Sequence, residues 1–192
     1  MPSRSNDPVD RALIRAVDTI VGLVDEQATP APVILIDGRS GAGKTSLSRR
    51  LHIALPDSHL LALDSVYPGW DGLRAGADQV LHNVLLPRAH GAGGTWSGWD
   101  WHLDEPAGAH DVPADGVLIV EGAGILTPAS AATAAVCVWV EAADHDRKRR
   151  ALTRDGDAYA PHWERWARQE DHHIRAHQPR GLADVVVDIP GD

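Results

Sequence analysis

The chain has 192 residues, 43% of them hydrophobic and 23% charged, which suits one sizeable core and leaves little room for a second domain. No apolar run approaches the roughly 18 residues that a membrane-spanning helix needs, so we expect no membrane partner. The 27 acidic and 18 basic residues give a net charge of −9, which disfavours nucleic acid as a partner. We therefore expect a single domain over residues 1–192.

The start of the chain lacks the basic flank and unbroken apolar stretch of a secretory signal, and we expect a cytoplasmic protein. Asp7 followed by Pro8 is typical of a helix start. Apolar residues then recur at helical spacing, which predicts a helix over about 8–26. The only cysteine, Cys137, lies in the apolar run AVCVWV and is predicted to be a buried structural thiol.

The middle and the end of the chain alternate between two patterns. Short apolar runs without polar alternation predict parallel strands covered on both faces, at 33–36, 59–63, 117–120, 135–140 and 184–187. Stretches with helical spacing lie between them, at 46–55, 73–86, 144–153 and 163–177. Strands that alternate with helices predict an α/β fold with a doubly wound parallel sheet.

The interval from 87 to 113 fits neither period. Its glycines and prolines surround three tryptophans, Trp96, Trp99 and Trp101. We interpret this interval as an inserted loop or hairpin.

A glycine-rich loop gives the most specific signal in the sequence. Residues 38–45, GRSGAGKT, satisfy the pattern G-x-x-x-x-G-K-[ST] directly after a predicted strand and before a predicted helix. The glycines let successive backbone N–H groups point at phosphate oxygens, and the helix dipole adds positive potential there. Lys44 is expected to reach the β and γ phosphates, and the Thr45 hydroxyl is expected to ligate Mg²⁺.

Chance and a dinucleotide site are poor alternatives for this loop. The chain has only two lysines, Lys44 and Lys148, and its composition gives on the order of one accidental match per thousand such chains. The dinucleotide pattern G-x-G-x-x-G is not completed, because Ser46 stands where its last glycine would be. The predicted nucleotide-binding residues are Gly38, Arg39, Ser40, Gly41, Ala42, Gly43, Lys44, Thr45 and Ser46.

Two acidic residues directly follow predicted strands. Asp64 follows HLLAL and Glu121 follows VLIV, and the ligand crevice of an open α/β sheet lies outside the carboxyl ends of its strands. Phosphoryl transfer needs one carboxylate near the accepting hydroxyl and usually another near Mg²⁺. The residues alone do not decide which is the general base. Asp37, just before the glycine loop, either acts as a third carboxylate or fixes the loop geometry.

Several separated segments resemble the uridine kinase and phosphoribulokinase-like P-loop kinases. The segments that carry this resemblance are IDGRSGAGKTSL (36–47), LDSVY (63–67), VLIVEG (117–122), VCVWVEAADHDRKRRALTRD (136–155) and ADVVVD (183–188). The resemblance implies a P-loop NTPase fold with a five-stranded parallel sheet flanked by helices, a short lid at about 144–162 and an acceptor-side insertion at about 87–113.

The resemblance also implies roles for individual residues. Asp64 becomes the general base, Glu121 supports Mg²⁺ beside Thr45, and Arg150 and Arg154 are lid arginines that close over ATP. Arg147 and Arg149 are expected to point outward. The pairing of a tyrosine and aspartate with a spaced histidine and arginine, typical of the nucleoside site in this family, is absent.

The segment after Asp64 supplies candidates for the acceptor site. Its glycines and proline predict a shaped loop, and aromatic side chains could stack on a base or a sugar. The acceptor-side candidates are Asp64, Tyr67, Trp70, Trp99 and Asp100, with packing of the insertion as the alternative role for the tryptophans. His173 and His177 share a helical face, but no acidic neighbour completes a zinc motif.

These observations favour an ATP- and Mg²⁺-dependent transfer of the γ-phosphate to a hydroxyl of a small metabolite, such as a nucleoside. Two alternatives stay open: a nucleotide-binding regulatory ATPase that acts on a protein partner, and a nucleoside monophosphate kinase. The latter needs cations in the acceptor region, where Arg74 and Arg88 are the nearby arginines. The sequence leaves the oligomeric state open, a homodimer included.

Overall fold

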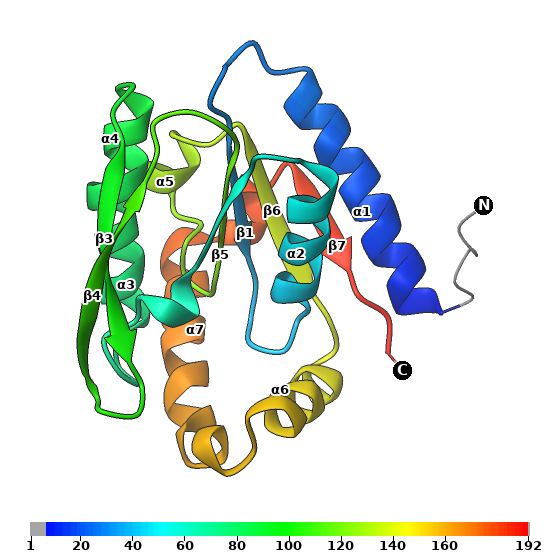
Figure 1. Ribbon diagram of the computed structural model, residues 1–192. Coiled ribbons are helices and arrows are strands. Elements are labelled where there is room, and N and C mark those ends of the chain that lie inside the picture. Colours follow the sequence, from blue (N-terminus) through cyan, green and yellow to red (C-terminus); the bar gives the residue numbers. More distant parts are fainter. Residues whose placement is uncertain (1–6, 192) are drawn as a thin grey trace.

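A five-stranded parallel sheet forms the centre of the computed structural model, which describes residues 7–191 (Figure 1). The strands are β1 (Val33–Asp37), β2 (His59–Ala62), β5 (Leu118–Glu121), β6 (Val136–Glu141) and β7 (Val185–Asp188), in the spatial order β2-β5-β1-β6-β7. All five predicted strands are present, and no end differs from its predicted position by more than one residue. The predicted P-loop NTPase type of sheet is therefore confirmed.

Strand β1 shows why the apolar runs lack polar alternation. Each of its residues is buried, with Val33 and Leu35 facing one core and Ile34 and Ile36 facing the other. Fully burying one such side chain contributes about 1.5–3 kcal/mol to folding. The side chains therefore have to be apolar on both faces, and the polar groups of β1 are confined to its carboxyl end at Asp37.

Helices cover both faces of the sheet (Figure 1). Helices α1 (Pro8–Asp25) and α2 (Lys44–Ala54) pack on the face of Ile34 and Ile36. Helices α3 (Leu73–Val80) and α7 (Trp163–His177) pack on the opposite face. The predicted start of α1 is confirmed, because the Asp7 carboxylate accepts a hydrogen bond from the Val9 N–H at 3.0 Å.

The segment that the sequence predicted as one helix at 73–86 is more complex. Helix α3 is followed by a π-helical turn at Leu81–Leu85 and by the short helix α4 (Leu86–Ala89). A π turn inserts an extra residue, which shifts the apolar stripe without interrupting helical periodicity. The pattern therefore could not reveal it, and the helical structure continues three residues beyond Leu86.

The inserted interval forms a β-hairpin along the edge of the molecule (Figure 1). Strand β3 (Gly94–Asp100) pairs antiparallel with β4 (Glu105–Val112), and Trp96 stacks on His110 with ring centroids 4.4 Å apart. Of the two interpretations of this interval, the hairpin is the correct one. The short helix α5 (Pro128–Ala131) leads from β5 to β6.

Helix α6 (Asp144–Tyr159) is longer than the predicted helix at 144–153. Gly156 lies inside it with φ 53° and ψ −134°, so the helix is kinked at this residue. A short 3-10 turn, Ala160–His162, connects α6 to α7. The segment predicted as a lid, residues 144–162, consists of α6 and this turn. Among residues 7–191, no helix is long and apolar enough to cross a membrane.

Candidate active site

The glycine-rich loop connects the buried end of β1 to the first turn of α2. Gly41 and Gly43 have φ values of 76° and 111°, which residues with a Cβ rarely adopt. A Cβ on Gly41 would lie 2.1 Å from the backbone oxygen of Arg147. Glycine is therefore required at position 41 both by the backbone conformation and by the close approach of α6.

Asp37 anchors the base of the loop. Its carboxylate accepts hydrogen bonds from the N–H groups of Gly38 (2.6 Å), Gly124 (3.0 Å) and Leu126 (2.8 Å). The ring nitrogen Nε2 of His173 lies 2.9 Å from the same carboxylate. Of the two roles that the sequence left open for Asp37, its contacts favour the fixing of loop geometry.

Lys44 and Thr45 lie at the start of α2, inside the curve of the loop. The Lys44 ammonium donates to the carbonyls of Gly38 and Arg39 at 2.8 and 3.2 Å. The Thr45 hydroxyl donates to Oε1 of Glu121 at 2.8 Å. The structure therefore brings together the two residues expected at the metal, although 76 positions separate them in the sequence.

Glu121 is almost fully buried, at 4% exposure. Burial raises the pKa of its carboxyl, while Lys44 acts in the opposite direction. The donors at this point, a hydroxyl and a carboxylate, are the oxygen ligands that Mg²⁺ prefers, and Mg²⁺ usually takes only one or two carboxylates besides phosphates and waters. The pair fits Mg²⁺, which would neutralise charge on a transferring phosphate. Within residues 7–191 there is no cluster of three or more His, Cys, Asp or Glu side chains placed to hold a metal.

Asp64 lies in the turn that follows β2, next to the end of β5. Ala62 pairs with Glu121 in the parallel register, so Asp64 extends beyond the sheet just past Glu121. Its side chain is exposed, and its negative charge contributes to the raised pKa of Glu121. Trp101 of the hairpin donates its indole N–H to the Asp64 carbonyl at 2.7 Å.

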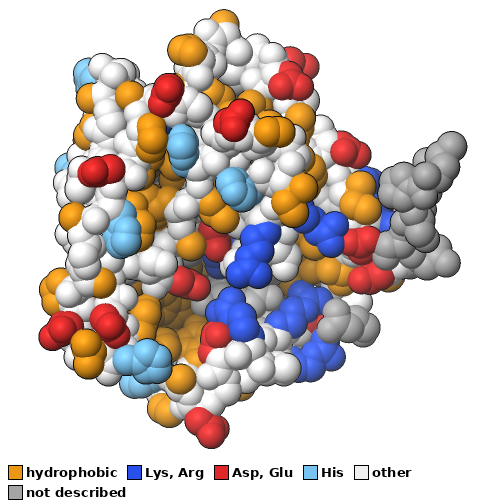
Figure 2. Space-filling view, in the orientation of Figure 1, with side chains coloured by type: hydrophobic (Ala, Val, Ile, Leu, Met, Phe, Trp, Pro, Cys, Tyr) orange, Lys and Arg blue, Asp and Glu red, His pale blue; other side chains and the backbone are white. Residues whose placement is uncertain are grey.

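The two arginines predicted to belong to a lid have separate environments. Arg154 forms two hydrogen bonds to Asp155, which is the main cause of its raised pKa, and the charges of Asp64 and Glu121 add to it. Arg150 donates to the Pro190 carbonyl at 2.9 Å, so it contacts the segment after β7. Lysine and arginine side chains gather over α2 and α6 in Figure 2.

The expectation that Arg147 points outward is wrong. Arg147 is 5% exposed, and its guanidinium donates to the Ser40 carbonyl at 3.1 Å. Arg149 is half exposed and pairs with Asp146, in agreement with the prediction for that residue. The sequence could not distinguish Arg147 from Arg149, because both lie in the basic run 147–150. The packing of α6 on the glycine-rich loop decides which of these side chains faces inward.

Among the aromatic acceptor-side candidates, Trp70 keeps a place beside the site. Its ring stacks on His162 at 4.3 Å and on Tyr159 at 5.4 Å between centroids, and it lies 4.9 Å from Trp101. Trp99 is half-buried, and its indole nitrogen has no hydrogen-bond partner within the described part of the chain.

Tyr67 has a structural role instead of the predicted substrate contact. It is 1% exposed, packs edge-on against Trp166 and donates its hydroxyl to the Ala123 carbonyl at 2.8 Å. It has no surface left for stacking on a substrate, so this prediction is wrong. The Oδ1 atom of Asp100 accepts from the N–H groups of His102 and Leu103, which closes the turn of the hairpin. A substrate contact of Asp100 stays a prediction.

Sequence reasoning missed two residues that contact the loop. Tyr159 of α6 is buried, its side chain lies close to that of Ser40, and burial raises the pKa of its hydroxyl. The Glu170 carboxylate accepts from the Ser40 N–H at 2.7 Å. A signal for Glu170 was available, because it shares the buried face of α7 with Trp163, Trp166 and His173, where a carboxylate without a function would be costly.

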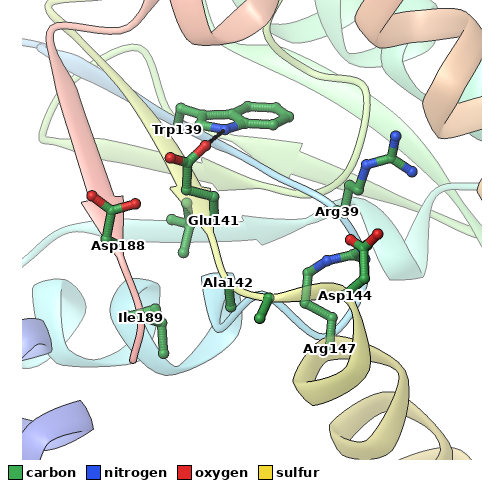
Figure 3. Close-up of a pocket in the computed structure, with 10 residues that line it drawn as sticks. Arg39, Trp139, Glu141, Ala142, Asp144, Arg147, Asp188 and Ile189 are labelled. Atoms are coloured by element: carbon green, nitrogen blue, oxygen red, sulfur yellow. Dashed lines mark hydrogen bonds and ion pairs between the residues drawn. The ribbon is translucent and has the colours of Figure 1, made fainter. Parts of the chain in front are cut away.

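A cavity of about 420 Å³ opens beside the loop at the ends of β6 and β7. Figure 3 shows Arg39 on one side of it and Asp188 on the other, with Trp139 above. The Trp139 indole donates to Glu141 at 2.9 Å. The cavity and Asp64 therefore lie on opposite sides of β1 in the sheet order.

Comparisons with solved structures confirm the fold. A possible uridine kinase from Bacillus stearothermophilus superposes with a TM-score of 0.67 at 16% identity, over 93% of this chain and 98% of that chain. A candidate fructose transport system kinase from Silicibacter sp. TM1040 gives 0.58 at 20% identity, over 91% and 98%. The YGR205w protein gives 0.61 at 11% identity, over 97% and 95%.

No protein-family model and no curated protein sequence matches the chain. The likeness therefore rests on structure, and at these identities it concerns the fold. The resemblance that the sequence segments suggested is confirmed at this level: the chain has the fold of the uridine kinase-like P-loop kinases.

Proposed function

We propose that the chain is an ATP-dependent phosphotransferase that uses Mg²⁺ to transfer the γ-phosphate to a hydroxyl of a small metabolite. One observation carries this proposal: the Thr45 hydroxyl lies against Glu121, with Asp64 exposed at the neighbouring strand end. These are a phosphate site, a metal site and a free carboxylate in the arrangement that phosphoryl transfer to a hydroxyl requires.

Each residue has a role that follows from its chemistry. Lys44 leaves the loop carbonyls and pairs with the β and γ phosphates. Asp64 accepts the proton of the attacking hydroxyl, which suits an exposed carboxylate beside the phosphate loop. Arg154 neutralises charge on the transferred group, because a guanidinium keeps its charge and donates along two parallel N–H bonds. Movement of α6 over the site would exclude water that competes with the acceptor.

The sheet order supports separate positions for the two substrates. Strands β2 and β5 end at Asp64 and Glu121 on one side of the loop, and the 420 Å³ cavity lies by β6 and β7 on the other. We infer that the nucleoside part of ATP extends toward this cavity and that the acceptor approaches from the side of Asp64. Trp70 and Trp101 then form an aromatic wall beside the acceptor.

The structure gives little support to a nucleoside monophosphate acceptor. Arg74 is exposed on α3 and pairs with Asp78. Arg88 is buried and donates to the carbonyls of Pro113, Asp115 and Gly116. Arg88 is thus engaged by the backbone, and no contact within the described residues brings Arg74 to Asp64, so an uncharged hydroxyl acceptor is the better proposal.

The test is transfer of label from γ-labelled ATP to a pool of nucleosides, sugars and vitamins, with products identified by mass spectrometry. Lys44→Ala is expected to lower transfer by at least roughly 100-fold, because it removes a cation from the charge-stabilising site. Lys148→Ala is the matched control, since Lys148 is the other lysine of the chain and pairs with Glu164 on the surface.

Unchanged transfer by Lys44→Ala would contradict the proposal. Nucleotide hydrolysis without a labelled product, lost in Lys44→Ala and kept in Lys148→Ala, would favour the regulatory ATPase instead.

A further inference from the structure

Ser40, in the middle of the phosphate loop, is held by side chains from the two helices that follow β6. Its N–H donates to Glu170 at 2.7 Å, and its carbonyl accepts from Arg147 at 3.1 Å. The Tyr159 side chain of α6 lies close to the Ser40 side chain. Both backbone polar groups of Ser40 are thus engaged by α6 and α7, although more than 100 positions separate them in the sequence.

The side chains of this set, which we call the Ser40 clamp (Arg147, Tyr159 and Glu170), are buried. Their exposures are 5%, 4% and 3%. A buried carboxylate is costly unless charges and hydrogen bonds compensate for its lost hydration. Glu170 has both, because it accepts the Ser40 N–H and lies near the positive charges of Lys44 and Arg147.

The contacts of the clamp also fix where the loop lies relative to α6. Gly41 packs directly on the backbone of Arg147, as its missing Cβ shows. Arg39, on the other side of Ser40, forms ion pairs with Glu170 and with its neighbour Asp171. The path of residues 39–41 is therefore determined by α6 and α7 as much as by the loop's own turns.

From this geometry we propose that Glu170 is a positioning residue of the phosphate loop, acting with Arg147 through Ser40. Glu170 holds the Ser40 N–H away from the nucleotide and keeps the following N–H groups, from Gly41 to Thr45, aimed at the phosphates. The clamp also connects the loop to α6, the helix of the proposed lid, and to α7. This inference rests on the proposed nucleotide site.

The experiment separates the hydrogen bond from the charge. Glu170→Met removes the acceptor at similar volume, whereas Glu170→Gln keeps an oxygen that can accept the Ser40 N–H. Glu164→Gln is the control, since it removes one negative charge from the same helix at a side chain that is 75% exposed and pairs with Lys148 on the surface. Nucleotide affinity is measured with Mg·ADP and with an ATP analogue that is not hydrolysed, and Ser40 amide hydrogen exchange is followed by NMR.

We expect Glu170→Met to weaken nucleotide binding by roughly 10- to 100-fold, because a charge-assisted hydrogen bond is lost. The Ser40 amide should then exchange faster in the same variant. Glu170→Gln should restore both to within about threefold, in line with a neutral hydrogen bond, and Glu164→Gln should resemble the parent protein. A merely structural role for Glu170 predicts lower stability with unchanged affinity.

Three outcomes would overturn the inference. The first is equal affinity of Glu170→Met and the parent at a temperature where both are folded. The second is tighter binding by either Glu170 variant, which would make the carboxylate a competitor of the phosphates. The third is failure of Glu170→Gln to restore affinity. If the parent protein itself does not bind the nucleotides, the proposed function fails, which is a distinct result.

Discussion

At the scale of single residues, Glu170 shows how a site can reduce stability. Burial raises the pKa of its carboxyl above the ordinary value of 4.5, and the nearby cations only partly oppose this. The folded state therefore holds the proton more tightly than the unfolded state does. Such a group stabilises the fold most below the unfolded pKa, and this contribution is lost as the pH rises through the folded pKa.

A pH series of urea unfolding tests this sign. The free energy of unfolding of the parent protein, minus that of Glu170→Gln, should fall as the pH rises above about 4.5, because glutamine does not titrate. Each unit of raised pKa corresponds to about 1.4 kcal/mol of this fall. The same series with Glu164→Gln serves as a control. A difference that grows with pH would show that the carboxylate is stabilised rather than strained by its surroundings.

The site residues differ in how far the sequence reveals them. Lys44 and Thr45 stand in a local pattern whose spacing is set by the loop itself, and their positions could be predicted. The roles of Arg147 and Tyr159 depend on how α6 docks on the loop, which no local pattern encodes. Tyr67 was misassigned because an aromatic residue after a strand suits a pocket and a core equally well.

At the scale of elements, the kink in α6 separates two parts of the segment that we propose as a lid. Arg147 and Arg150 lie before Gly156, and Tyr159 lies after it. The φ and ψ of Gly156 are strained for any residue with a Cβ, yet nothing lies within 4 Å of the position that a Cβ would take. The glycine is thus required by conformation and not by space, and the buried Tyr159 side chain follows the kink.

Two glycine substitutions with opposite expected signs test the kink. Gly156→Ala should destabilise the lid by about 1–2 kcal/mol, because alanine resists a positive φ, and should lower kcat/KM. Gly22→Ala is the control, since Gly22 lies in α1 with open space around it and should gain roughly 0.5–1 kcal/mol. Urea unfolding and steady-state kinetics measure both. Unchanged kcat/KM in Gly156→Ala would show that the kink is not needed for function.

The elements themselves were largely predictable. Apolar runs identified each strand, and the three central strands β1, β5 and β6 show the reason, because a strand buried on both faces has to be apolar throughout. The hairpin escaped a firm assignment because β4 is exposed along nearly its whole length and so carries no alternation. Its docking depends instead on contacts such as that of Trp101 with Asp64, which join distant parts of the chain.

At the scale of the whole molecule, the reactivity of the Cys137 thiol can be used to measure the opening of the sheet. It lies in β6, which pairs with β1 and β7, and it is 4% exposed. Burial, and then the charge of Asp184, raise the pKa of its thiol to about 12. Because the thiolate is the reactive form, Cys137 should be inert toward alkylating reagents at neutral pH until the sheet opens.

Labelling of Cys137 therefore measures global unfolding and, through it, nucleotide binding. If refolding is faster than labelling, a ligand that binds only the folded protein slows the reaction by the factor 1 + [L]/Kd, which is about 100-fold at a hundred times Kd. Mg·ATP should slow labelling in this way in the parent protein and in Lys148→Ala, but much less at the same concentration in Lys44→Ala. The rate should also rise steeply with urea. A labelling rate that does not depend on urea would mean that the reagent reaches Cys137 through a local opening beside β7. If Mg·ATP slowed labelling equally in Lys44→Ala, the nucleotide would be binding without the phosphate loop, in contradiction to the proposed site.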